Sequence, residues 1–282
     1  MKLAIASGKG GTGKTTLTVA LAQAAQAPVQ LLDCDVEEPN SHLFFTKGDS
    51  KRDVVTVAVP HIDPQRCTHC GLCGDFCAYN ALACLPTETI LFEGLCHSCG
   101  GCMRLCPHQA ISERQQRIGY IDQWRHGQID LFSGVLDVGQ AMSPPLIRAV
   151  KRHQQADKLI LLDCPPGTSC PLTTTIHDAD VVILVTEPTP FGLHDLQIAV
   201  ETVRQLNRPV AVIINRSDLG DQSIHDYCRS KKIPILLQIP FEKRIAVAYS
   251  RGDGLLDALP GLQPQLALVL NQARKLYREN LT

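Results

Sequence analysis

The chain has 282 residues, of which 44% are hydrophobic and 20% are charged, and this composition excludes a disordered protein. Its 27 basic and 28 acidic residues give a net charge of -1, so no global positive field indicates a nucleic-acid partner. No run reaches the roughly 18 apolar residues that a membrane helix needs, so we expect no membrane partner. The first residues are too short for a secretory signal and lead directly into a glycine loop, so we expect a cytoplasmic protein.

Strand-like apolar runs alternate with helix-like stretches along most of the chain. Continuous Val, Ile and Leu runs suit strands that are buried on both faces. We therefore expect an α/β fold, a mostly parallel sheet flanked by helices. The predicted strands are 3–6, 29–32, 54–59, 158–162, 181–186, 210–214 and 235–239, with a hairpin at 118–121 and 129–138. The predicted helices are 17–26, 144–155, 191–206, 221–231 and 262–280.

The first predicted strand leads into a phosphate-binding loop. Residues 8–15 read GKGGTGKT and fit the pattern G-x-x-x-x-G-K-[ST]. Lys14 is expected to reach the β- and γ-phosphates, and the Thr15 hydroxyl to bind Mg²⁺. Thr16 and the helix N-terminus add donors and a favourable dipole. The predicted nucleotide-binding residues of the loop are Gly8, Gly10, Gly11, Thr12, Gly13, Lys14, Thr15 and Thr16.

Carboxylates follow two of the predicted strands, at the edge where open α/β sheets bind ligands. Asp33 and Asp35 follow the strand at 29–32, and Asp163 follows the strand at 158–162. Phosphoryl transfer needs a held metal ion and an oriented water, and aspartates supply both functions. Asp33 could equally be a turn or helix-cap residue.

The run Lys9-Gly10-Gly11-Thr12-Gly13-Lys14-Thr15 resembles the deviant Walker motif of the MinD/ParA/Mrp class of P-loop ATPases. The resemblance covers residues 1–60 and about 113–260, and we expect an ATPase domain at 1–60 and 113–282. It implies that ATP or ADP binds with Mg²⁺, and that two subunits meet across the nucleotide as a homodimer or a heterodimer with a paralogue.

The same resemblance gives roles to individual residues. It implies that Lys9 acts on the nucleotide of the partner subunit, although a solvated surface lysine is the alternative. Asp35 would orient or activate water, and Asp163 would hold Mg²⁺. Gly167 would let the backbone approach the γ-phosphate. Asn215 would contact adenine, with a strand-end turn residue as the alternative.

Cysteine is unusually frequent, with 13 in the chain. An odd count without an export signal argues against a disulfide framework and favours metal binding. CTHCGLCGDFCAYNAL at 67–82 matches CHSCGGCMRLCPHQAI at 96–111, an offset of 29 residues. Both runs have the bacterial ferredoxin spacing C-x2-C-x2-C-x3-C, and the second also has the following proline. The candidate metal ligands are Cys67, Cys70, Cys73, Cys77, Cys96, Cys99, Cys102 and Cys106.

This spacing predicts two [4Fe–4S] clusters with crossed ligation, because the fourth cysteine of each run reaches the other cube. The module at 61–112 resembles a two-cluster ferredoxin inserted in the ATPase domain. Zinc is the alternative, although zinc sites usually separate two cysteine pairs by a longer loop. Cys84 is interpreted as a buried apolar thiol. One cluster is assigned to Cys67, Cys70, Cys73 and Cys106, and the other to Cys96, Cys99, Cys102 and Cys77.

Together the motifs predict an ATP-hydrolysing iron–sulfur protein. We expect a nucleotide-driven dimer cycle that is coupled to electron transfer, or to metal-cluster handling, with a partner protein. The alternative is a nucleotide-switched carrier or assembly factor for iron–sulfur or other metal clusters. The C-terminal C-x-x-C that the Mrp branch uses for a bridging cluster is missing, which weighs against a bridging-cluster scaffold.

Overall fold

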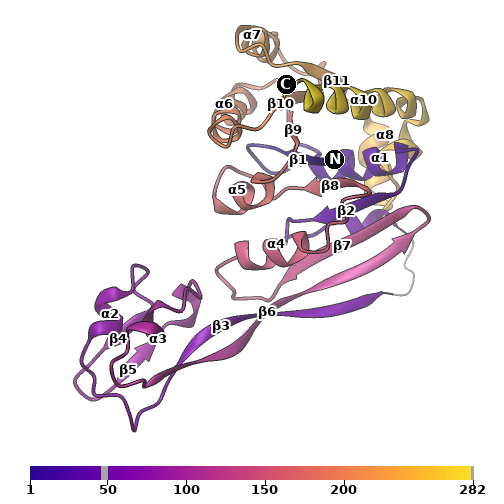
Figure 1. The fold of residues 1–282 in the computed structure, drawn as a ribbon. Coiled ribbons are helices and arrows are strands. Elements are labelled where there is room, and N and C mark those ends of the chain that lie inside the picture. The colour runs from indigo at the N-terminus through magenta and orange to yellow at the C-terminus, as the bar shows by residue number, and fades with distance from the viewer. Residues whose placement is uncertain (46–49, 281–282) are drawn as a thin grey trace.

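A nine-stranded sheet organises the part of the chain that the computed structural model describes, residues 1–45 and 50–280 (Figure 1). Residues 46–49 and 281–282 belong to the predicted ATPase domain but lie outside the described residues. The strand order is β11-β10-β9-β1-β8-β2-β7-β6-β3. The strands are β1 (Lys2–Ala6), β2 (Val29–Asp33), β3 (Lys51–Ile62), β6 (Ile111–His126), β7 (Ile129–Leu136), β8 (Leu159–Asp163), β9 (Val181–Thr186), β10 (Val210–Asn215) and β11 (Ile235–Ile239).

The sheet is mostly parallel, as the sequence predicts. Each neighbouring pair from β11 to β7 is parallel, whereas β6 runs antiparallel to both β7 and β3. The central strands are buried on both faces, which explains their continuous apolar sequences. Leu3, Ile5, Leu31 and Leu161, for example, are fully buried.

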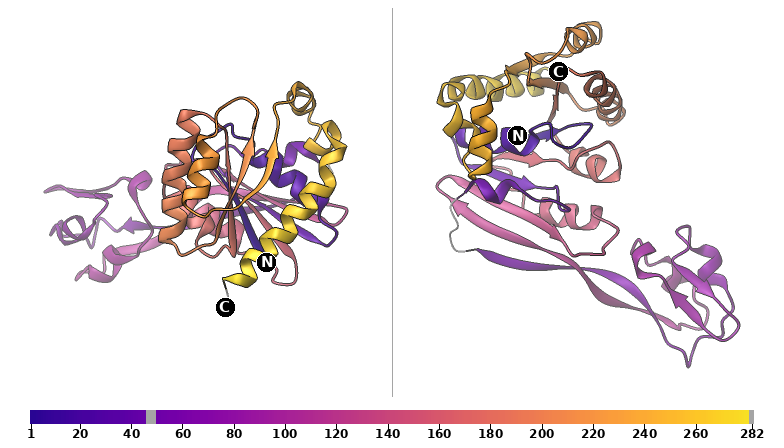
Figure 2. Two further views of the ribbon diagram at one scale, coloured as in Figure 1. Left: turned by 90° about the horizontal axis from the view of Figure 1, so that it is seen from above. Right: turned by 180° about the vertical axis from the view of Figure 1, so that it is seen from behind.

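Helices cover both faces of the sheet, as Figure 2 shows from above. The helices α4 to α7 pack on one face through residues such as Leu146 and Leu196, and α1 and α10 pack on the other through Leu17 and Leu266. No helix in the described part of the chain is long and apolar enough to cross a bilayer. The helices are α1 (Lys14–Ala24), α4 (Pro144–Lys151), α5 (Cys170–Ile176), α6 (Pro190–Gln205), α7 (Ser223–Ser230), α8 (Lys243–Ser250), α9 (Leu255–Ala258) and α10 (Gln263–Glu279), with 3-10 turns at Ser41–Phe44 and Pro260–Leu262.

Strands β3 and β6 form a long ribbon that leaves the sheet and carries a small lobe at its far end (Figures 1 and 2). Their pairing ends at Ile62 and Ile111, and the predicted insert begins and ends on the neighbouring pair, His61 and Ser112. The strands predicted at 54–59 and 118–121 are therefore only parts of much longer strands. The lobe contains α2 (Leu72–Phe76), β4 (Leu82–Cys84), β5 (Thr89–Leu91), a 3-10 turn at Glu93–Leu95 and α3 (Gly101–Leu105).

Candidate functional site

The loop between β1 and α1 has the backbone shape that phosphate binding requires. Gly11 and Gly13 have φ angles of 76° and 92°, in the left-handed region that favours glycine. Gly13 immediately precedes α1, and a Cβ atom there would lie 2.8 Å from Nδ2 of Asn215. That same amide nitrogen donates a hydrogen bond to the Thr12 carbonyl at 2.9 Å. The end of β10 therefore supports the loop directly.

A cavity of about 480 Å³ opens beside this loop. It brings the loop together with Asp35 and Asn215, which follow or end other strands of the sheet. Phe241 and Tyr249 contribute aromatic surface to its wall, which suits a flat apolar group such as a nucleobase. The predicted loop residues that line it are Gly10, Gly11, Gly13, Lys14, Thr15 and Thr16.

Asp33 and Asp163 are cross-strand neighbours on β2 and β8, and both are fully buried. Burial, followed by the negative charge of Asp163, raises the pKa of Asp33 well above its ordinary value. Burial also raises the pKa of Asp163, although hydroxyl groups and Lys14 oppose the shift. Two adjacent buried carboxylates fit the ligand chemistry of a divalent cation, which would neutralise their charge.

Ser41 connects these two carboxylates, and no sequence motif identifies it as a site residue. Its backbone N–H donates to Asp33 at 3.0 Å, and its hydroxyl donates to Asp163 at 3.2 Å. Thr18 of α1 donates to the other oxygen of Asp163 at 3.4 Å. Ser41 follows Asp35 in the chain, so the segment after β2 is tied to the strand that ends at Asp163.

Asp35 lines the large cavity near Lys14. Burial raises its pKa to about 7, and the charge of Asp163 adds to the shift while Lys14 opposes it. A carboxylate with such a pKa can accept a proton near neutral pH. The chemistry of Asp35 therefore suits a residue that orients and activates water.

Lys9 forms an ion pair within its own subunit. Its Nζ lies 3.5 Å from Oε2 of Glu187, and the other carboxylate oxygen lies 2.8 Å from Nη1 of Arg216. Glu187 is buried and directly follows β9. Lys9 lies beside Gly8 and Thr12 and does not line the large cavity. Glu187 and Arg216 were not predicted as site residues, because their meeting depends on the strand order.

Gly167 contacts the phosphate loop from the segment that follows β8. Its φ angle is 86°, and its N–H donates to the Ser7 carbonyl at 3.2 Å. Pro166 lines the large cavity, whereas Gly167 does not. The Gly167 N–H must therefore leave Ser7 before it can donate to a phosphate.

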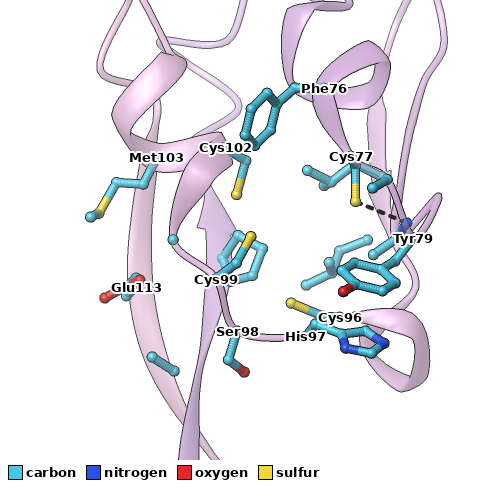
Figure 3. A pocket seen from close by; sticks show the side chains of 17 residues that line it. Phe76, Cys77, Tyr79, Cys96, His97, Ser98, Cys99, Cys102, Met103 and Glu113 are labelled. Carbon is cyan, nitrogen blue, oxygen red and sulfur yellow. Dashed lines mark hydrogen bonds between the residues drawn. The ribbon is translucent and has the colours of Figure 1, made fainter. Parts of the chain in front are cut away.

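The cysteines of the lobe line two separate cavities. The cavity drawn in Figure 3 has a volume of about 160 Å³, and the second, of about 20 Å³, has the space of about one water molecule. In the first cavity, the Tyr79 and His97 rings stack with centroids 3.4 Å apart. The first cavity is lined by Cys77, Cys96, Cys99 and Cys102. The second is lined by Cys67, Cys70, Cys73, Cys84 and Cys106.

The internal sequence repeat is also a repeat of backbone geometry. Left-handed φ angles occur at three pairs of positions that are each 29 residues apart. The N–H groups of Ala81 and Ala110, also 29 apart, donate to the sulfurs of Cys77 and Cys106, both at 3.3 Å. Such N–H···S bonds stabilise thiolates at iron–sulfur sites. The left-handed pairs are His69 and Ser98, Gly71 and Gly100, and Asn80 and Gln109.

Within residues 1–45 and 50–280, no group of three or more His, Cys, Asp or Glu side chains is arranged to hold a metal ion. The lobe thiols instead surround cavities, four in one and five in the other. Thiolates around a cavity are the donor set that iron–sulfur clusters use. Filling the second cavity with a cube would require its walls to move apart.

The thiols next to Asp33, Asp35 and Asp163 in the sequence have a different environment. Cys34 and Cys164 are completely buried in the core. Burial raises the pKa of both thiols far above the ordinary value, so they remain protonated. They therefore pack as small apolar residues, whereas Cys170 is exposed.

A family model and curated relatives match most of the chain. The model of the CobQ/CobB/MinD/ParA nucleotide binding domain matches residues 3–256. The uncharacterized protein MJ0578 of Methanocaldococcus jannaschii is 34% identical over 226 residues, which cover 78% of this chain and 80% of the relative. The iron-sulfur cluster carrier protein of Rickettsia bellii is 24% identical over 264 residues, which cover 90% of this chain and 66% of that protein.

Among solved structures, the fold is similar to that of the septum site-determining protein MinD of Pyrococcus horikoshii, complexed with Mg-ADP. The TM-score is 0.54 and the identity 20%, with 99% of this chain and 94% of the MinD chain covered. This likeness confirms the predicted P-loop fold.

Proposed function

The chain belongs to the CobQ/CobB/MinD/ParA nucleotide-binding family, and we propose that it is an ATPase whose dimer cycle is coupled to iron–sulfur chemistry with a partner protein. The observation that carries the proposal is that one chain has a phosphate loop beside a large cavity and two cavities that are each lined by a predicted cysteine quartet. The similarity to the iron-sulfur cluster carrier protein of Rickettsia bellii supports the iron–sulfur part of this proposal.

In the nucleotide step, Lys14 and the loop N–H groups bind the phosphates, and Asp35 orients the attacking water. The proposal for Asp35 rests on its place in the cavity beside Lys14 and the phosphate loop. Thr15 is the proposed Mg²⁺ ligand, and Asp163 would help to hold the ion without ligating it directly, with Asp33 supporting Asp163 from the neighbouring strand. When bound, Mg²⁺ supplies positive charge that stabilises the phosphates during transfer.

In the dimer step, we propose that Lys9 reaches the nucleotide of the partner subunit and stabilises transition-state charge there, as an arginine finger does. In the isolated subunit, the Lys9 ammonium pairs with Glu187. ATP-dependent dimerisation must therefore exchange this internal ion pair for one with the nucleotide. The partner subunit is a second copy of the chain or a paralogue.

In the lobe, we assign two [4Fe–4S] clusters to the two thiol quartets. The first cavity contains Cys77 together with three cysteines of the second run, and the second contains Cys106 together with three of the first run. This grouping across the repeat supports crossed ligation. Bound clusters supply one-electron chemistry, and the N–H donors of Ala81 and Ala110 hold two of the ligating sulfurs in place.

The ribbon supports the coupling between the two halves. Ser41 ties the segment after β2 to Asp163, and the same segment leads toward β3, the first strand of the ribbon. The two hydrogen bonds of Ser41 depend on the charges around the phosphate site, because both aspartates that it contacts are buried there. A nucleotide-dependent change at Ser41 therefore has a route to the lobe.

The test begins with iron and sulfide analysis of the anaerobically purified chain, for which about eight irons per chain are expected. ATP turnover and dimerisation are then measured with the clusters oxidised and reduced. A difference between the two states supports coupling. Identical turnover and identical dimerisation would contradict it, and a colourless, zinc-loaded chain would contradict the iron–sulfur assignment.

A second candidate function is a nucleotide-switched carrier of metal clusters, which the similarity to the iron-sulfur cluster carrier protein of Rickettsia bellii favours. Transfer to an apo-acceptor or to a chelator separates the candidates. A carrier loses its clusters in a nucleotide-dependent manner, whereas an electron-transfer protein keeps them through reversible redox cycles.

A further inference from the structure

One of the two thiol-lined cavities contains a fifth cysteine. Cys84 lines the same cavity as Cys67, Cys70, Cys73 and Cys106, and its Sγ lies 3.6 Å from the Sγ of Cys73. Cys84 is only partly buried and ends β4, so the interpretation as a buried apolar thiol was wrong. The structure therefore places a second thiol beside Cys73, which is one of the four predicted ligands.

Local geometry leaves room for this extra thiol. A Cβ atom on Gly74 would lie 3.3 Å from the Cys84 sulfur and 3.3 Å from the Leu82 carbonyl oxygen, so any larger residue at position 74 would crowd Cys84. In the other half of the repeat, 29 residues later, Gly74 corresponds to Met103 and Cys84 corresponds to Glu113. Both of those residues line the other cavity, which has no fifth thiol among its described lining.

We propose that Cys84 is a reserve ligand of the iron–sulfur site in this cavity and can take the place of Cys73. The inference rests on the proposed function, since it concerns how that site holds its cluster. Thiolate sulfur is the ligand that iron–sulfur clusters require, and a neighbouring sulfur can replace Cys73 after a side-chain rotation. In the exchange, Cys84 loses its proton and binds iron, Cys73 leaves iron and takes up a proton, and no electron moves.

The asymmetry of the repeat gives a matched test. Cys73 and Cys102 occupy equivalent positions, 29 residues apart, but only Cys73 has a spare thiol among its described neighbours. Iron and sulfide are measured in the full chain, purified anaerobically. We expect the Cys73→Ala variant to keep about eight irons, whereas Cys102→Ala falls to about four. The double variant Cys73→Ala/Cys84→Ala should also fall to about four.

Alkylation with iodoacetamide, followed by mass spectrometry, gives a second readout. Cys84 should react in the wild-type protein and become protected in the Cys73→Ala variant. Cys73→Ser repeats the comparison with a side chain of similar shape. Equal iron loss in Cys73→Ala and in the double variant, with Cys84 still reactive, would overturn the proposal. A wild-type chain without iron would instead refute the iron–sulfur function itself, and the reserve ligand with it.

Discussion

The Lys9 ammonium and the Glu187 carboxylate form an ion pair between the phosphate loop and the end of β9, with Nζ and Oε2 3.5 Å apart. Arg216 binds the other oxygen of the same carboxylate, so Glu187 is held in position from β10 as well. A lysine that acts on a partner's nucleotide must first leave this carboxylate. On the proposed role of Lys9 at the partner's nucleotide, the pair would therefore oppose dimerisation.

Replacing Glu187 with glutamine should favour the ATP-bound dimer. Lys9 is partly exposed, so each pair with Glu187 contributes only about 0.5–1 kcal/mol, and the two pairs that a homodimer breaks correspond to roughly a five- to thirtyfold lower dimer dissociation constant. Analytical ultracentrifugation with ATP measures this constant. Asp226→Asn, which removes an exposed ion pair with Arg229 on α7, is the control and should have no effect. A weaker dimer in Glu187→Gln would contradict the argument.

Replacing Lys9 with alanine should preserve ATP binding while turnover falls by roughly a thousandfold, the effect of removing an arginine finger. Lys9 does not line the large cavity, so its loss should not disturb the nucleotide pocket of its own subunit. Calorimetric binding and steady-state phosphate release measure the two effects. Lys14→Ala is the comparison and should lose ATP binding itself. Normal turnover in Lys9→Ala would show that the lysine has no catalytic role.

Glycine at position 8 is required by packing, whereas glycine at position 10 is not. A Cβ atom on Gly8 would lie 2.5 Å from the backbone oxygen of Asp195, but one on Gly10 would have no neighbour within 4 Å. We expect Gly8→Ala to lower the free energy of unfolding by about 2 kcal/mol and Gly10→Ala to change it little. Urea unfolding without nucleotide measures both. Equal stability of the two variants would refute the packing argument.

Asp178 connects two lysines, with its carboxylate oxygens 2.6 Å from Lys2 Nζ and 2.5 Å from Lys151 Nζ. Burial alone would raise the pKa of Asp178, but hydrogen bonds from Lys151 and Lys2 lower it below its ordinary value. Its stabilising contribution is therefore present above the ordinary pKa of about 3.9 and is lost as the pH falls through the lower folded value.

Asp178→Asn should accordingly reduce the free energy of unfolding by about 1 kcal/mol at pH 7, since the side chain is partly exposed. The difference from wild type should disappear at a pH below the folded pKa. Denaturant unfolding at a series of pH values provides the measurement. A stability difference that is the same at every pH would indicate a packing effect rather than a charge effect.

The sequence predicts the centre of the fold well, because parallel strands that are buried on both faces have continuous apolar sequences. The strand predicted at 181–186 coincides with β9, and the strands at 210–214 and 235–239 correspond closely to β10 and β11. The ribbon was harder to predict. β6 includes the polar stretch 112–117, which has no apolar pattern because most of it is exposed. Only its pairing with β3 in the structure identifies this stretch as a strand.

The candidate site likewise has one part that the sequence predicts and another that it does not. The phosphate loop and the cysteine runs are local patterns, so their residues could be listed from spacing alone. The contacts of Ser41 with Asp163, and of Glu187 with Lys9, join segments that only the strand order brings together. Cys84 was missed for a related reason, because its place beside Cys73 depends on how β4 packs against α2.

The ribbon ends at Ile62 and Ile111, which face each other across its two strands. Both ends of the cysteine segment thus leave the ATPase body from one point, and a short hairpin turn could close the ribbon in its place. The body would keep its chain path whether or not that segment were present. A segment attached in this way could be inserted or deleted in one genetic event. The buried core of the nucleotide-binding domain would not need to change.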